Sequence, residues 1–189
     1  MITTLPPAAA DDAELMGAVT DLVNKVYRES EQGLWVDGAA RTGTAEVAAL
    51  TRAGELVAAR RDGRLIGVLR LRRWDDESSE FGMLAADPAV RGEGVGRALI
   101  RYAEQTAQAS GHRYMRLELL VPRSFTLASK EFLAAWYTRC GYQQERVGRI
   151  EEVHPHLAPL LATEADFRVY RKELPISFQE APGPAASLA

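Results

Sequence analysis

Residues 87–98 read Asp-Pro-Ala-Val-Arg-Gly-Glu-Gly-Val-Gly-Arg-Ala, and this stretch decides the fold class. Its three glycines alternate with other residues directly before a helix, which the apolar spacing of residues 98–107 predicts. The mostly apolar run at residues 80–86 stops at the Asp-Pro pair and predicts a strand in front of the glycines. A strand, a glycine turn and a helix therefore follow one another near the centre of the chain.

A turn of this kind can bind an oxyanion. Glycine amides carry no obstructing Cβ atoms, so their N–H groups can converge on phosphate oxygens, and the helix dipole adds to the attraction. A diphosphate fits, and Arg91 and Arg97 on either side can add charge-assisted contacts. A Walker A loop is excluded, since this loop ends in Gly-Arg-Ala and not in Gly-Lys-Ser/Thr. A dinucleotide fingerprint is disfavoured, because the sixth position counted from Gly92 is arginine. The plainer alternative is a tight helix entry without a ligand.

Length and composition narrow the class of protein. The 189 residues suit one domain with a core of its own, and 47% apolar with 26% charged residues is ordinary globular composition. The net charge of −3 disfavours nucleic acid and anionic membranes as partners. The N-terminus lacks signal-peptide features, no run approaches a membrane span, and the single cysteine, Cys140, cannot form an intramolecular disulfide. These features favour a cytoplasmic protein.

The rest of the chain predicts alternating helices and strands. Asp62-Gly63 supplies the positive φ angles of a tight hairpin turn between two extended runs. We expect one domain over residues 1–174 and a disordered Pro-, Ala- and Gly-rich tail over residues 175–189. The predicted helices cover residues 12–29, residues 45–50 capped by Thr44, and residues 131–140; the predicted strands cover residues 55–61, 64–72, 114–121 and a final antiparallel pair at 143–150 and 166–172.

The glycine stretch resembles the GNAT superfamily of N-acetyltransferases. The matching pattern is Arg-x-x-Gly-x-Gly from Arg91 to Gly96, after a strand that ends in Asp-Pro. A second match is FLAAWYTRCGY at residues 132–142, which is similar to the family's Tyr-x-x-x-Gly-Phe/Tyr helix end, with Tyr137 as the first tyrosine. The resemblance runs from about residue 64 to 142.

The resemblance implies an α/β fold with a mixed, mainly antiparallel sheet flanked by helices. The sheet would be splayed after the strand containing Glu80, so that the pantetheine of acetyl-CoA, the implied co-substrate, inserts beside the strand containing Tyr114. Many relatives carry an asparagine where this chain has Lys130, whose ammonium could reach the phosphates as a point charge. The implied cofactor-binding residues are Leu84, Ala86, Arg91, Gly92, Glu93, Gly94, Val95, Gly96, Arg97 and Lys130.

Three side chains are implied as catalytic. An alkyl ammonium has a pKa of about 10.4, so a base must help to release the neutral amine that attacks the thioester. Glu80 matches the glutamate of the histone acetyltransferase branch and Glu118 that of ribosomal-protein acetyltransferases, and either could accept the proton directly or through water. Tyr137 stands where the family protonates the coenzyme A thiolate. The plainer alternative for each glutamate is a strand-end or edge carboxylate that faces solvent or an arginine. For the tyrosine it is a ring packed against the sheet with its hydroxyl bonded elsewhere.

The acceptor amine is the least determined part. The resemblance places it against the first two helices and their loop, which offer Tyr27, Trp35 and Arg41. Arg41 could grip a carboxylate on a small acceptor, although loop packing for Trp35 and a solvated charge for Arg41 are the plainer interpretations.

The sequence therefore favours an N-acetyltransferase that acts on the primary amine of a small molecule by direct attack in a ternary complex. The alternatives are a protein N-terminal or lysine acetyltransferase and, outside enzymes, an acyl-CoA-binding sensor. No metal is expected, since His112, His154 and His156 lack a convincing ligand set. The oligomeric state stays open, a homodimer included.

Overall fold

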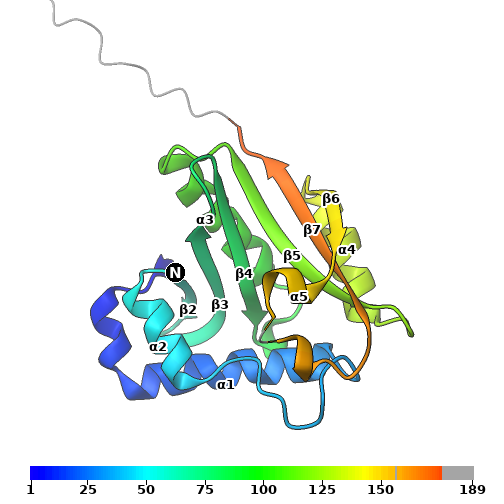
Figure 1. Cartoon of the computed structure of the whole chain (residues 1–189). Helices are drawn as coiled ribbons and strands as arrows, with labels where there is room; N and C mark the ends of the chain where they lie inside the picture. The colour runs from blue at the N-terminus through cyan, green and yellow to red at the C-terminus, as the bar shows by residue number, and fades with distance from the viewer. Residues whose placement is uncertain (156, 176–189) are drawn as a thin grey trace, which may run out of the picture.

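A seven-stranded sheet with the strand order β1-β2-β3-β4-β5-β7-β6 forms the centre of the protein (Figure 1). The computed structural model describes residues 1–155 and 157–175. The strands are β1 (Ile2–Thr4), β2 (Leu56–Arg61), β3 (Arg64–Arg73), β4 (Ser78–Ala86), β5 (Tyr114–Pro122), β6 (Gln143–Gly148) and β7 (Ala165–Glu173). The α-helices are α1 (Ala13–Ser30), α2 (Thr44–Arg52), α3 (Val95–Ala109), α4 (Ala128–Arg139) and α5 (Ile150–Val153). Every strand pair is antiparallel except β4 with β5, so the predicted mixed, mainly antiparallel sheet is confirmed.

Local sequence signals explain several of these elements. Asp62 and Gly63 join β2 to β3 with φ angles of +49° and +79°, as the hairpin prediction requires. Helix α1 begins after Asp12, whose carboxylate accepts a hydrogen bond from the N–H of Leu15 at 2.9 Å. The final antiparallel pair, β6 with β7, is also confirmed.

Three details differ from the sequence prediction. Strand β1 and helix α5 were not predicted, because three or four residues are too few for a periodic pattern and both are held by tertiary pairing. Thr44 does not cap α2: Gly43 occupies the N-cap position with an extended backbone, and Thr44 is already helical. Residues 176–189 of the tail and His156 lie outside the described residues.

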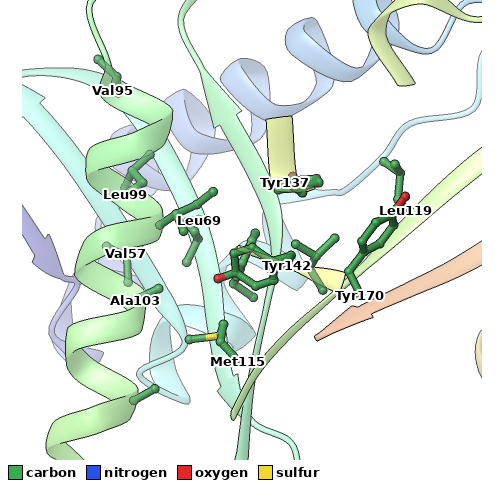
Figure 2. Close-up of a cluster of buried hydrophobic side chains, with 14 of the residues drawn as sticks. Val57, Leu69, Val95, Leu99, Ala103, Met115, Leu119, Tyr137, Tyr142 and Tyr170 are labelled. Carbon is green, nitrogen blue, oxygen red and sulfur yellow. The ribbon is translucent and has the colours of Figure 1, made fainter. Parts of the chain in front are cut away.

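Helices cover both faces of the sheet. On one face, Val19 and Val23 of α1 and Val47 of α2 pack with the sheet residue Val68. On the other face, α3 and α4 pack over a larger apolar cluster, part of which is drawn in Figure 2 with Val57, Leu69, Leu99, Tyr137 and Tyr142 among its labelled members. Among the described residues, no helix has the length and apolar character to cross a membrane.

Strands β4 and β5 separate soon after they begin. They pair only at residues 78–80 against residues 114–116 and then diverge, as Figure 1 shows. A β-bulge bends β4 at the same level, because Met83 and Leu84 together stand opposite Leu69, and Met83 adopts a φ of +50°. The predicted splay after Glu80 is therefore present.

Candidate active site

The glycine loop, residues 91–97, ends at the N-terminus of α3. Gly92 and Gly94 have φ angles of +86° and +80°, a region that favours glycine, and Gly94 is the N-cap of the helix. The amides of Gly92 and of residues 94–97 donate to no acceptor among the described residues. Several N–H groups therefore stand unbonded at the positive end of a helix dipole, which is the arrangement that binds phosphate.

The charges around the glycine loop also favour an anion. The side chain of Glu93, the acidic residue of the loop, pairs with Arg61 on the β2–β3 hairpin at 2.6 Å. Arg91 and Arg97 are exposed and form no ion pair with a described residue. The loop thus presents two unpaired guanidinium groups beside its free amides, while its carboxylate is neutralised by the hairpin.

A line of alternating charges crosses β3, β4 and β5 near the splay. Glu80 lies directly between Arg72 and Arg116 in the register of the three strands. Arg72 donates to Glu80 Oε1 from Nε at 2.9 Å and from Nη2 at 2.6 Å. Arg116 Nε lies 2.9 Å from Glu80 Oε2, but the N–H does not point at the oxygen, so neither atom has a hydrogen-bond partner among the described residues. The guanidinium of Arg116 also covers the ring of Trp74 at 3.7 Å from its centre.

Glu118 continues this line towards the C-terminal part of the chain. Arg116 Nη2 donates to Glu118 Oε1 at 2.9 Å, and His154 Nε2 lies 3.0 Å from Glu118 Oε2. The five side chains from Arg72 to His154 therefore form one connected ionic network, defined here as Arg72, Glu80, Arg116, Glu118 and His154.

The network gives its two glutamates different acidities. Burial raises the pKa of Glu80, and the neighbouring charge of Glu118 adds to this effect. Together they outweigh the two arginines, which lower the pKa. Burial also acts on Glu118, but the hydrogen bond and charge of His154, together with Arg116, overcome it and lower the pKa. Of the two carboxylates, Glu80 therefore holds a proton more readily than Glu118.

Tyr137 of α4 lies buried in the apolar cluster of Figure 2. Its ring is 6.0 Å from that of Phe81 and 6.1 Å from that of Tyr142, measured between ring centres. Its hydroxyl forms no hydrogen bond with a described residue. Burial, with a smaller contribution from the nearby hydroxyl of Tyr27, raises the pKa of Tyr137 far above its usual value, so the phenol keeps its proton at neutral pH.

A cavity of about 780 Å³ contains the three residues predicted for the acceptor, which we call the α1 pocket. The structure brings Tyr27, Trp35 and Arg41 together on its wall, with the guanidinium of Arg41 over the Tyr27 ring at 5.1 Å from its centre. Trp35 pairs with Leu161 in an isolated bridge, and the same segment contributes Leu157 and Leu160 to the pocket wall. The rest of the wall comes from the last turns of α1 and from most of residues 31–41.

Lys130 occupies a different environment from the expected one. It is buried and forms an ion pair with Glu31, which also accepts a hydrogen bond from Trp35 Nε1 at 2.5 Å. The ammonium is thus held against the α1 pocket by a carboxylate and not directed at the glycine loop. Leu84 and Ala86 are half-buried and lie on the part of β4 that has already diverged from β5.

Sequence reasoning missed three members of the ionic network. Arg72 and Arg116 become recognisable only when the register places them opposite Glu80. His154 was interpreted as a loop residue, and no local signal pointed to its contact with Glu118, which lies 36 residues earlier. Within residues 1–155 and 157–175, no three His, Cys, Asp or Glu side chains are grouped as metal ligands would be.

Residues 52–144 match the family model of the acetyltransferase (GNAT) domain. A search of curated protein sequences gives no match.

Solved structures share the fold over almost the whole chain. An aminoglycoside 6′-N-acetyltransferase complexed with coenzyme A is 15% identical, with a TM-score of 0.66 over 93% of this chain and 97% of that one. The PaiA N-acetyltransferase of Thermoplasma acidophilum, also with coenzyme A, is 14% identical, with a TM-score of 0.67 over 92% and 98%. A ribosomal-protein alanine N-acetyltransferase of Escherichia coli is 14% identical, with a TM-score of 0.61 over 96% and 97%. Residues 52–144 are therefore identified as a GNAT acetyltransferase domain by their match to the family model, and the fold shared with these solved structures extends over almost the whole chain.

Proposed function

We propose that this protein transfers an acetyl group from acetyl-CoA to the primary amine of a small molecule by direct attack in a ternary complex. The observation that carries the proposal is the set of unbonded amides in the glycine loop, which lie at the N-terminus of α3 and follow β4, the strand that diverges from β5 at the splay. A diphosphate on these amides, with Arg91 and Arg97 beside it, would leave the pantetheine to run along the splay. The main-chain groups from Leu84 to Ala86 would then polarise the thioester carbonyl.

Two side chains would move the protons. Glu80, whose pKa is raised, would accept a proton from the incoming ammonium, directly or through a water molecule, and Glu118 is the alternative acceptor. The neutral amine then forms the new C–N bond while the C–S bond breaks, and the extra proton left on the acylated nitrogen would replace the one that Tyr137 gives up. Tyr137, which keeps its proton at neutral pH, would donate it to the departing sulfur.

The α1 pocket supports a small acceptor. Its volume of about 780 Å³ lies within the range of small-molecule sites, roughly 300–1,000 Å³. Tyr27 and Arg41 would line the path of the acceptor.

The decisive experiment combines binding and turnover. Calorimetry should show binding of coenzyme A, and incubation with acetyl-CoA and a panel of small primary amines should release free thiol together with an acetylated small molecule detected by mass spectrometry. Acetylated protein in place of a small product would establish the protein acetyltransferase. Coenzyme A binding without thiol release over the whole panel would establish a sensor, and absence of coenzyme A binding by the folded protein would refute the proposal.

A further inference from the structure

Two aromatic side chains of α4 are stacked on the outside of the molecule. Phe132 and Trp136 are one helical turn apart, and their rings are nearly parallel, with centres 6.4 Å apart and an angle of 17° between the planes. Phe132 is 61% exposed, the largest fraction among the exposed aromatic residues described. Neither the packing of α4 nor the proton transfers proposed above use the outer face of this ring.

The pair lies next to the glycine loop. A Cβ atom on Gly96 would be 3.3 Å from the Cη2 atom of Trp136, so the indole touches the first turn of α3. The other side of Trp136 packs against Tyr137, with ring centres 5.3 Å apart. The indole is therefore fixed between the glycine loop and the apolar cluster, and it supports the exposed ring of Phe132.

We propose that Phe132 and Trp136 form a stacking platform for the adenine ring of the co-substrate. The inference rests on the proposed function, because it takes the diphosphate of coenzyme A to lie on the glycine loop. The adenosine is attached directly to that diphosphate, so the base must lie near the loop. A flat aromatic pair beside a phosphate site is the surface on which a nucleobase stacks, and such stacking needs no charged partner.

The test compares two ligands that differ by the 3′-phosphoadenylate part. Coenzyme A carries the base, whereas 4′-phosphopantetheine keeps a phosphate and the thiol arm but lacks it. For Phe132→Ala we expect the affinity for coenzyme A, measured by calorimetry, to fall about 10-fold, a typical loss for one base–aromatic stack. The affinity for 4′-phosphopantetheine and the turnover at saturating acetyl-CoA should not change. Alanine suits an exposed helical site, so the variant should fold.

Two further variants separate stacking from apolar contact. Phe132→Tyr keeps a planar ring and should bind coenzyme A like the wild type, whereas Phe132→Leu keeps apolar area without a ring and should behave like Phe132→Ala. Val147→Ala, which removes exposed apolar surface on β6, is the matched control and should change nothing.

Three results would overturn the inference. These are equal coenzyme A affinity in Phe132→Ala and the wild type, equal loss of affinity for both ligands, and a changed oligomeric state in sedimentation without a ligand-specific effect, which would make the pair a contact between copies of the chain. A wild-type protein that binds neither ligand would instead refute the proposed function.

Discussion

The buried ion pair between Lys130 and Glu31 gives a quantitative prediction. The side chains are only 6% and 4% exposed, so solvent screens their charges little. Lys130→Met would leave the Glu31 carboxylate buried with the indole N–H of Trp35 as its remaining donor. Removing one partner of a buried pair costs about 3–5 kcal/mol, because the other charge is left uncompensated. For a chain of this length, that loss corresponds to a fall in melting temperature on the order of 10 °C.

A second variant tests the cause of this loss. Combining Lys130→Met with Glu31→Gln removes both charges and keeps an acceptor for Trp35, so most of the stability should return. The free energy of unfolding would be measured by urea denaturation with tryptophan fluorescence, at an unchanged dependence on urea. Arg52→Met, which breaks the exposed pair with Asp11, serves as control and should change stability by about 0.5 kcal/mol or less.

A loss of unfolding free energy below about 1 kcal/mol for Lys130→Met would show that the unpaired Glu31 charge is not the cause, and so would a double variant no more stable than the single one. The same proteins test the role of the lysine. Because the ammonium is paired with Glu31, the double variant should bind coenzyme A as tightly as the wild type. A loss of affinity without a loss of stability would restore the phosphate contact expected from the sequence.

Three further predictions concern the glycine loop and the ionizable groups. Tyr137→Phe should lower kcat about 100-fold or more in the acetylation assay, with little change in coenzyme A affinity, because only the proton donor is removed; equal loss of binding would contradict that role. Gly94→Val should abolish measurable coenzyme A binding in calorimetry, since its φ of +80° strains a branched residue by about 1–3 kcal/mol, whereas Gly17→Ala in α1 should leave binding intact. Because the pKa of Glu118 is lowered in the folded protein, its ionised form stabilises the fold above the ordinary pKa of 4.5, and this stabilisation is lost as the pH falls through the folded-state pKa. Glu118→Gln should therefore reduce the loss of unfolding free energy between pH 6 and pH 3, measured by urea denaturation at each pH. An equal loss in the variant and the wild type would argue against this role.

Local sequence signals were sufficient to predict the elements that contain residues with unusual backbone angles. Asp62-Gly63 predicts its hairpin because few other dipeptides tolerate two positive φ angles. The glycine loop predicts its helix entry for the same reason, since Gly92 and Gly94 both adopt left-handed conformations. The splay followed from the family resemblance and not from any local pattern.

The ionic network could not be predicted, because it depends on distances between strands. Arg72, Glu80 and Arg116 meet only in the register that the structure shows, and a shift of one residue would send Glu80 to the opposite face. Lys130 shows the same dependence on contacts that are distant in the sequence, because its ion-pair partner could not be inferred from the family position. Glu31 lies 99 residues earlier in the chain and determines where the ammonium points.

The short pairing of β4 with β5 has a consequence for how the empty protein behaves. Past residues 80 and 116, the two strands form no ladder with each other among the described residues, so side-chain packing and not main-chain pairing holds this part of the sheet together. If coenzyme A inserts there as proposed, it stabilises the fold when bound and is also a reactant. Amide hydrogen exchange along residues 83–86 should then slow on its addition, and the supply of coenzyme A would set how well this protein withstands heat and proteases.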